Sequence, residues 1–344
     1  METMDTARYS RHMLFPQIGS NGQEKLLQSR VAIVGMGALG TVLANHMVRS
    51  GVGYVRLIDR DFVEWSNLQR QMLYNEEDAL KYLPKAVAAS NTLSKINSQI
   101  QIEPHVTDLT SQNAESILSN VDLILDGTDN YQVRFLINDV SVKHHIPWIY
   151  GGAVSANGMT YTIIPGETPC LRCLFDRPPA PGTTPTCDTA GVIGPIIHVI
   201  ASLQAAEALK YLIGDRSHMS PFSMSVHLWN NQFQQIDISN ARNLSCPCCG
   251  QNQYEYLQAS IKEQTSTLCG RDTVQIVSNE PLSIDLASFA ENMKRVGEVE
   301  YNKYLVRVKV SSMTFVVFAD GRTLIQGTSD PSIARSLYAK YIGM

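Results

Sequence analysis

The fold is decided by residues 30–71, RVAIVGMGALGTVLANHMVRSGVGYVRLIDRDFVEWSNLQRQ. The run 31–34 is apolar and rich in β-branched residues, which is typical of a buried parallel strand. Gly35, Gly37 and Gly40 follow it as G-x-G-x-x-G and open a helical pattern with apolar residues on one face. The order strand, glycine loop, helix and second strand predicts a Rossmann-like, doubly wound α/β sheet.

The second strand, 54–58, is followed directly by Asp59. This acid lies about 20 residues after the glycine loop, where a Rossmann-like unit places a carboxylate on a ribose hydroxyl. Taken alone, the pattern favours an NAD-dependent oxidoreductase. The polar and cationic side chains that follow this strand favour a nucleoside triphosphate instead. A cation at this position can stabilise negative charge that develops on the phosphates during a reaction or departs with a phosphate leaving group. These side chains are Asn67, Gln69, Arg70 and Gln71.

Composition narrows the class of protein. The chain has 344 residues, enough for two domains, with 44% hydrophobic and 17% charged residues, which are values of a globular protein. The net charge of −4 gives no reason to expect nucleic acid or an anionic membrane as a partner. No secretory signal is recognisable at the N-terminus. The apolar stretch 192–209 is interrupted by polar residues, so we expect a buried helix, not a membrane span, and a cytoplasmic protein.

Two cysteine pairs have the spacing of metal ligands. Cys170 and Cys173 form one C-x-x-C, and Cys246 and Cys249 form another. In a reducing compartment two such turns predict a zinc tetrathiolate, and four protein ligands leave no position for substrate, so the zinc would be structural. Cys248 lies inside the second turn and has poorer spacing. The alternative is a set of reduced, unpaired thiols.

Cys187 stands apart from these pairs. It lies in residues 177–191, RPPAPGTTPTCDTAG, which are too rich in Pro, Thr and Gly for regular structure. A mobile loop with a single thiol suits a nucleophile that moves towards a bound acyl group. An incidental loop cysteine is the alternative.

Acidic residues also follow another buried strand. The apolar run 121–125 ends in DGTDN, which contains Asp129 and Asn130. Ligands of open α/β sheets collect at such strand ends, and an acid there suits magnesium or the nucleotide. A helix N-cap before residues 131–140 is the alternative, and the two roles do not exclude each other. Elsewhere, Pro84 and Lys85 interrupt the helical pattern 76–96, and the turn predicted there could expose Lys85 to a ligand.

The composition changes after residue 250. We predict a nucleotide-binding domain at 1–250, a polar linker at 251–267 and a small α+β domain at 268–344. In the last domain an Asp-Gly turn at 320–321 between apolar runs predicts a hairpin. The expected fold is thus α/β, with a Rossmann-like doubly wound mixed sheet, a structural zinc site and this small second domain.

Several motifs together resemble one family. GMGALG, IDRDFVEWSNLQRQ, PKA, DGTDN, TCDTAGVIGP and CPCCG occur in the order found in the bacterial ThiF/MoeB adenylyltransferases, relatives of ubiquitin-activating enzymes. The resemblance covers about residues 8–250. The remainder is similar to the C-terminal extension of Gram-positive members, and it assigns that domain no chemistry.

The resemblance implies a role for each site residue. It places Asp59 on the ATP ribose and assigns phosphate contacts to Asn67, Gln69, Arg70 and Lys85. Asp129 and Asn130 would complete the nucleotide and Mg²⁺ site, and Arg11 would enter the ATP site of the partner in a homodimer. The polar residue Gln71 and the glycine loop, Gly35, Gly37, Ala38 and Gly40, belong to the same site; relatives often have glycine where this chain has Ala38.

The implied activity is ATP-dependent adenylylation of a small ubiquitin-like sulfur-carrier protein. The carrier would be of the ThiS or MoaD type, for thiamine thiazole synthesis, molybdopterin synthesis or both. The presence of Cys187 slightly favours the thiamine branch. A cysteine desulfurase or another sulfur donor would be a further partner. An NAD-dependent oxidoreductase leaves Arg70, Lys85 and the cysteine pairs unexplained. A non-catalytic interaction protein of this family would be expected to lack some ATP residues, whereas here all are present.

Overall fold

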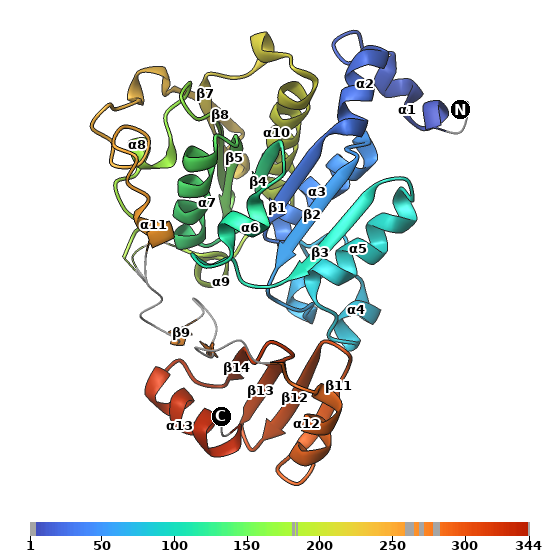
Figure 1. The fold of residues 1–344 in the computed structure, drawn as a ribbon, viewed down its shortest axis with the longest axis vertical. Helices are drawn as coiled ribbons and strands as arrows, with labels where there is room; N and C mark the ends of the chain where they lie inside the picture. The colour runs from blue at the N-terminus through green and yellow to red at the C-terminus, as the bar shows by residue number, and fades with distance from the viewer. Residues whose placement is uncertain are drawn as a thin grey trace. The chain divides into compact units, whose positions relative to one another are not determined.

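The computed structural model describes residues 5–180, 183, 185–258, 265–267, 272–277 and 283–342. The chain forms two compact units (Figure 1). The first comprises Met1–Ala180 and Ala190–Ala259, and the second comprises Pro181–Thr189 and Ser260–Met344. Each unit is described by itself.

The first unit alternates helices and strands. Its α-helices are α1 (Asp5–Met13), α2 (Gly19–Gln28), α3 (Ala38–Ser50), α4 (Glu76–Leu80), α5 (Lys85–Ile96), α6 (Ala114–Leu118), α7 (Tyr131–His144), α8 (Leu171–Leu174), α10 (Gly194–Ile213) and α11 (Glu255–Gln258). Its strands are β1 (Arg30–Val34), β2 (Tyr54–Asp59), β3 (Gln101–Val106), β4 (Leu123–Asp126), β5 (Trp148–Val154), β6 (Asn157–Ile163), β7 (Phe222–His227) and β8 (Gln232–Asp237). Short 3₁₀ turns are η1 (Trp65–Asn67), η2 (Arg216–His218), η3 (Leu228–Asn230) and η4 (Ser239–Ala241).

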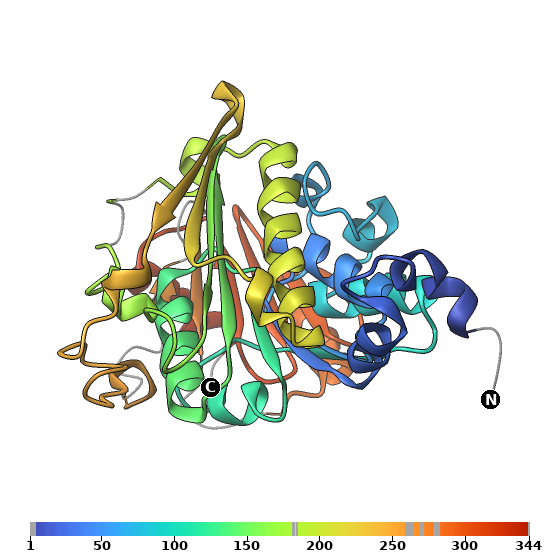
Figure 2. The same ribbon diagram turned by 90° about the horizontal axis from the view of Figure 1, so that it is seen from above.

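The strands form one eight-stranded sheet in the order β3-β2-β1-β4-β5-β6-β7-β8. β3, β2, β1, β4 and β5 pair in parallel, and β6, β7 and β8 continue the sheet antiparallel. The predicted doubly wound mixed sheet is confirmed. Helices cover both faces (Figure 2). One apolar core joins the sheet to α2, α3, α5 and α10, and a second joins it to α6 and α7.

α10 has the length and mean hydropathy, 1.4, of a membrane-spanning helix. Its apolar residues Ile196, Ile197 and Ile200 are buried in the first core. Gln204 on the same helix donates from Nε2 to the carbonyls of Asp126 (2.9 Å) and Ile149 (3.1 Å) in the sheet. α10 is therefore a core helix of the sheet, as the interrupted hydropathy predicts.

Three glycines bring two loops into backbone contact at the carboxyl edge of the sheet. A Cβ on Gly40 would lie 1.8 Å from the carbonyl oxygen of Gly35, and one on Gly127 would lie 2.5 Å from the same oxygen. Gly35 has a φ of +87° and would meet the Gly127 backbone at 2.9 Å. Gly37 is different, because a Cβ there would meet open space. The loops after β1 and β4 can thus touch only because these positions lack side chains.

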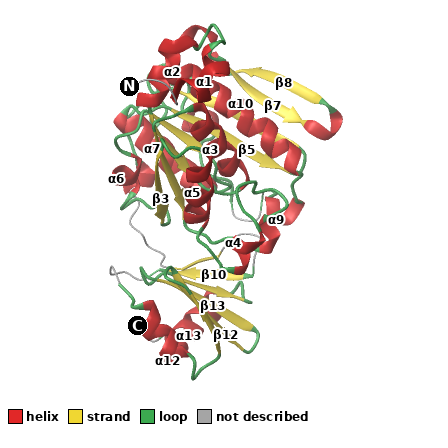
Figure 3. Cartoon of the chain, turned by 90° about the vertical axis from the view of Figure 1, so that its right-hand side faces the viewer, coloured by secondary structure: helices red, strands yellow, loops and turns green. Residues whose placement is uncertain are grey.

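The second unit contains a sheet in the order β11-β12-β13-β14-β10-β9, with α12 and α13 packed on one face (Figure 3). The strands are β9 (Thr265–Thr267), β10 (Thr273–Ile276), β11 (Glu298–Tyr301), β12 (Leu305–Val310), β13 (Met313–Phe318) and β14 (Thr323–Gln326). The helices are α9 (Cys187–Ala190), whose last residue belongs to the first unit, α12 (Leu286–Met293) and α13 (Pro331–Tyr341). β13 and β14 form the predicted antiparallel hairpin.

Two sequence expectations about local structure were wrong. Residues 177–191 were expected to lack regular structure, but α9 is helical because Thr186 and Thr189 cap it reciprocally, each main-chain N–H donating to the other's hydroxyl (2.9 and 3.2 Å). The expected linker 251–267 contains α11 and β9. Asp139, which is distant in sequence, accepts hydrogen bonds from the α11 main chain and orders that helix, whereas β9 is ordered by pairing with the next strand, β10.

Gly40→Ala is expected to destabilise the first unit, whereas Gly37→Ala is expected to leave its stability unchanged. The added methyl group at position 40 would meet the Gly35 carbonyl, and overpacking of this kind costs roughly 1–3 kcal/mol. This cost outweighs the gain of about 1 kcal/mol from alanine's helix propensity. Thermal unfolding followed by circular dichroism tests the pair. Equal stability of the two variants would contradict the close contact of the loops.

Candidate active site

The candidate site lies where the loops after β1, β2 and β4 meet at the carboxyl edge of the sheet. Asp59 ends β2, and its carboxylate accepts hydrogen bonds from the main-chain N–H of Met36 (2.6 Å) and Asp61 (2.7 Å). Burial raises the pKa of Asp59, while the nearby charge of Lys85 opposes the rise. Asp59 thus holds the glycine loop against β2 at the position predicted to face a ribose.

Lys85 is placed at the same edge by the first turn of α5. Its ammonium group pairs with Asp61 at 3.3 Å, and its main-chain N–H donates to the Asp61 carbonyl at 2.9 Å. Lys85 is only 4% exposed, so little water screens its charge. Tyr74 donates from its hydroxyl to the carbonyls of Met36 (2.6 Å) and Lys85 (3.2 Å), which ties the glycine loop to α5. Burial raises the pKa of Tyr74 well above its ordinary value, so the phenol stays a donor.

The segment 67–71 has buried and exposed positions in turn. Asn67 is fully buried, and its side chain accepts from the Glu64 main chain at 3.0 Å in a capping box of η1, a local structural role that the sequence did not predict. Gln69 is exposed, and Arg70 donates to the Ser66 carbonyl at 2.8 Å. Gln71 is 3% exposed, and its side-chain oxygen has no hydrogen-bond partner among the residues that the structure describes. A buried acceptor of this kind is expected to meet a donor when a ligand or water is bound.

The loop after β4 presents Asp129 outwards. Asn130 caps α7 by accepting from the main chains of Gln132 (2.8 Å) and Val133 (3.3 Å), so its capping role is present. The Asp129 side chain is exposed and has no hydrogen bond or ion pair within the described part of the chain. An exposed carboxylate at this edge fits the oxygen donors that Mg²⁺ requires.

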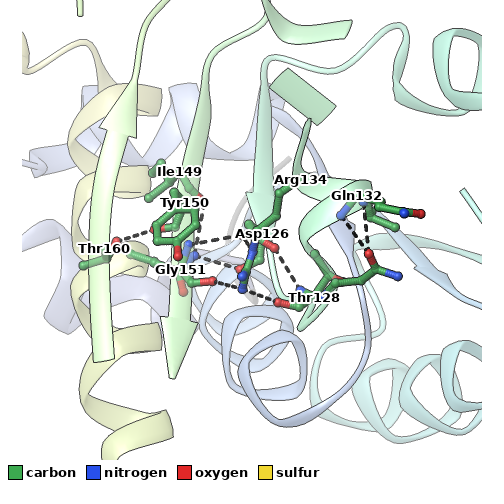
Figure 4. Close-up of polar contacts among 11 residues, drawn as sticks. Asp126, Thr128, Gln132, Arg134, Ile149, Tyr150, Gly151 and Thr160 are labelled. Atoms are coloured by element: carbon green, nitrogen blue, oxygen red, sulfur yellow. Dashed lines mark hydrogen bonds and ion pairs between the residues drawn. The ribbon is translucent and has the colours of Figure 1, made fainter. Parts of the chain in front are cut away.

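A buried ion pair lies directly behind this loop (Figure 4). Arg134 on α7 binds the Asp126 carboxylate at 2.9 Å and donates to the carbonyls of Thr128 (2.6 Å) and Gly151 (2.8 Å). Burial disfavours its charge, but Asp126 more than offsets this, so the pKa of Arg134 is raised. The guanidinium also lies over the Tyr150 ring, 4.9 Å from its centroid. Arg134 therefore links β4, α7 and β5.

Arg11 lies far from the site of its own chain. It is exposed on α1, which packs against the C-terminal ends of α3 and α5. Tyr9 accepts from Asn97 at 2.8 Å, and Arg8 donates to the Ile96 carbonyl at 2.7 Å. The helices α3 and α5 begin at the carboxyl edge and end at the amino edge, so α1 sits at the amino edge of the sheet, at the top of Figure 1. The structure therefore does not bring Arg11 to the other predicted site residues.

The two cysteine pairs come together as their spacing predicts. The Sγ atoms of Cys170, Cys173, Cys246 and Cys249 all lie within 4.8 Å of one another, with distances of 3.8 Å (170–173), 3.6 Å (170–246) and 3.4 Å (173–249). Four sulfurs at 2.3 Å from a tetrahedral zinc are about 3.8 Å apart, so this cluster could hold the ion. The hydrogen bond with Cys170, together with burial, raises the pKa of Cys173 to about 12. Four thiolates this close together repel one another, so a bound cation would be needed to hold them all ionised.

Cys248 lies outside this cluster. Its sulfur is fully buried, accepts from Asn138 Nδ2 at 3.2 Å and donates to Asp139 at 3.4 Å. Asn138 also accepts from the Leu171 main chain at 2.8 Å, so one α7 side chain touches both cysteine turns. These contacts give Cys248 a local structural role beside the four-cysteine cluster.

Cys187 begins α9 and is half-buried. Its segment, Pro181–Thr189, belongs to the second compact unit, whereas the nucleotide loops belong to the first. The geometry within each unit therefore says nothing against a role for Cys187 and assigns none.

Three residues of this site were missed in the sequence: Asp61, Tyr74 and Arg134. Asp61 had a signal, because it is the second acid of Asp59-Arg60-Asp61 at a strand end. Tyr74 and Arg134 had none, because their partners are contributed by other elements: main-chain carbonyls for both, and the Asp126 carboxylate for Arg134.

These features define a class. A glycine loop, an acid at the next strand end and a lysine at a helix start meet at the switch point of a doubly wound sheet, which is the arrangement of a Rossmann-like nucleotide-binding protein. The family model described as "ThiF family" matches residues 9–248, and the chain belongs to this family.

Individual relatives agree with this assignment. A protein of Bacillus subtilis named "Sulfur carrier protein ThiS adenylyltransferase" is 43% identical over 98% of this chain and 100% of its own length. A Thermus thermophilus "Sulfur carrier protein adenylyltransferase" is 39% identical over 71% of this chain and 90% of its own. Among solved structures, Escherichia coli MccB matches with a TM-score of 0.62 at 24% identity, over 71% of this chain and 75% of that one, and supports the fold alone.

Cys173→Ser is expected to lose bound zinc and to lower the melting temperature, because metal binding contributes folding free energy. Cys248→Ser is the matched control and should keep the metal, since Cys248 is not one of the four clustered thiols and its sulfur is held by Asn138 and Asp139. Metal content of protein purified without chelator, together with thermal unfolding, tests both variants. One zinc per chain retained in Cys173→Ser would contradict the tetrathiolate.

Proposed function

We propose that this protein is an adenylyltransferase that activates the C-terminal glycine carboxylate of a small ubiquitin-like sulfur carrier with ATP. The carboxylate attacks the α-phosphorus, the bond to the β-phosphate oxygen breaks, and pyrophosphate leaves with its electron pair. The product is a carrier acyl-adenylate ready to accept sulfur.

The relation to the Bacillus subtilis protein carries this proposal. It extends over 98% of the chain, and therefore includes the C-terminal unit as well as the nucleotide-binding unit. The name of that relative points to a carrier of the ThiS type, and so to the thiazole branch of thiamine synthesis over the molybdopterin branch. Family membership and the residues at the carboxyl edge argue against an NAD-dependent oxidoreductase. The presence of Asp59, Arg70, Lys85 and Asp129 argues against an inactive family member.

The chemistry needs positive charge more than it needs a base. The attacking carboxylate is already ionised at neutral pH. Two anions must meet, and negative charge grows on the phosphate oxygens in the transition state, so fixed cations supply most of the stabilisation. Lys85, held by Asp61 and almost fully buried, and Arg70 would provide this charge at the phosphates. Asp59 would bind the ribose hydroxyls, and Gly37 would let the main chain approach the phosphates.

Two metal ions belong to the proposal. Asp129 would hold Mg²⁺, which neutralises phosphate charge when bound, and its exposed carboxylate fits that role. Zinc in the four-cysteine cluster would be structural, because no coordination position remains for substrate. It would fasten residues 246–249 to residues 170–173, which are 76 positions apart in sequence.

The proposal also includes the localisation, the oligomeric state and the partners of the protein. We place it in the cytoplasm as a homodimer whose Arg11 completes the partner's site, with a sulfur donor such as a cysteine desulfurase as a further partner. Cys187 would act after adenylation: its thiolate would attack the acyl carbon of the carrier adenylate, the carbon–oxygen bond to the phosphate would break, and AMP would leave.

Arg70→Ala and Lys85→Ala are expected to abolish carrier-dependent ATP–pyrophosphate exchange without unfolding the protein. Each removes roughly 3 kcal/mol of transition-state stabilisation, a rate loss of more than a hundredfold. Cys187→Ser separates the steps, because exchange should persist while a thiol-sensitive adduct with the carrier disappears. Exchange within about threefold of wild type in both cation variants would remove these residues from the mechanism.

Mixing Arg11→Ala chains with Arg70→Ala chains is expected to restore exchange. Each variant is inactive alone, but half the dimers in a statistical mixture are heterodimers with one intact composite site, so recovery should reach roughly a quarter of wild type. The measurement is exchange after subunits have been mixed and shown to redistribute. Redistribution without recovery would mean that Arg11 acts in its own chain or not at all.

A further inference from the structure

The loop after β4 is anchored on both sides of Asp129. Thr128 uses all its polar groups inside the fold: its N–H donates to Asp126 (2.9 Å), its hydroxyl accepts from the Asn130 N–H (3.0 Å), and its carbonyl accepts from Arg134 (2.6 Å). Asn130 is fixed in turn as the N-cap of α7. Asp129 is therefore held between two immobilised residues, and its own side chain is the one directed to solvent.

Arg134 is the centre of this anchoring (Figure 4). It is 4% exposed, its positive charge is matched by Asp126, and it also grips the Gly151 carbonyl of β5. The Nε and Nη2 donors of this guanidinium are committed to Asp126, Thr128 and Gly151 inside the fold. Its effect on the site must pass through the main chain that it holds.

We propose that Arg134 is a positioning residue that sets the place of the Asp129 carboxylate, and thereby of the divalent cation, by clamping the Thr128 carbonyl to β5. The proposal rests on the proposed function, which makes Asp129 the cation ligand. Outer contacts of this kind usually change metal affinity by about 10- to 100-fold. An ammonium group cannot replace the clamp, because it lacks the planar fork that reaches Asp126 and two carbonyls together.

The test must separate positioning from folding. Arg134→Gln alone would leave the Asp126 carboxylate buried without its partner, which is strongly destabilising. The double variant D126N/R134Q removes both charges and leaves two amides, so it should fold. Arg134→Lys is the second variant, which keeps a charge beside Asp126 but loses the fork. Arg56→Gln is the control, because Arg56 forms a less buried ion pair with Glu103 (3.0 Å) between β2 and β3, away from the Asp129 loop.

The first measurement is Mn²⁺ affinity in the presence of ATP, by electron paramagnetic resonance, with thermal unfolding alongside. We expect a loss of about 10- to 100-fold in folded D126N/R134Q and in Arg134→Lys, and none in Arg56→Gln. Adding Asp129→Asn should weaken Mn²⁺ binding in wild type but add little in D126N/R134Q, since the carboxylate is already displaced. Affinity within threefold of wild type in a folded variant, or fully additive losses, would overturn the proposal.

A second measurement does not depend on nucleotide. Hydrogen–deuterium exchange of the peptide containing residues 127–133, without ATP, should be faster in D126N/R134Q and unchanged in Arg56→Gln. Unchanged exchange would overturn the clamp itself. Faster exchange in a protein whose wild type neither binds Mn²⁺–ATP nor exchanges pyrophosphate would uphold the clamp and instead contradict the proposed function.

Discussion

The contact between the Gly35 carbonyl and the backbones of Gly40 and Gly127 constrains everything else at the carboxyl edge. No Cβ fits at either of the last two positions, so the loops after β1 and β4 meet main chain to main chain. This contact fixes the direction in which α3 starts, and it fixes the position of the Asp129 loop relative to the glycine loop. Asp59 adds to it by holding the N–H of Met36 in the same glycine loop. The nucleotide site is therefore first a backbone arrangement, onto which individual side chains bring charge.

The parallel half of the sheet could be predicted from sequence because its signals are local. Buried runs such as 31–34 and 121–125, the glycine motif and the acids at strand ends each lie within a few residues. The far end of the sheet, from β5 to β8, had no such signal. β5 contains Gly151 and Gly152, and β8 is exposed along its whole length, so neither has the alternation of a half-buried strand. α11 is ordered mainly through Asp139, more than a hundred residues earlier in the chain.

The same distinction applies to the site. Charged residues at a strand end or a helix start, such as Asp129 and Lys85, could be selected from the sequence by residue type and position. Residues that act through another residue could not. Arg134 occurs in the helical pattern of α7 and would be read as a surface arginine, yet it is buried beside Asp126. Asn67 shows the converse, because its side chain caps η1 within its own segment. Polar residues in a motif therefore include some that shape the loop as well as those that face the ligand.

The position of α1 supplies a physical argument for the proposed composite site. Strands of five or six residues separate the two edges of the sheet by about 20 Å, far more than one arginine side chain spans. α1 cannot swing across this distance while Tyr9 is 3% exposed and bonded to Asn97, and while Arg8 holds the end of α5. If Arg11 serves an ATP site at all, that site must belong to another chain. The cations of this active site would then come from two sources: Lys85 and Arg70 fixed within the fold, and Arg11 present only after assembly, so that adenylation would depend on dimer formation.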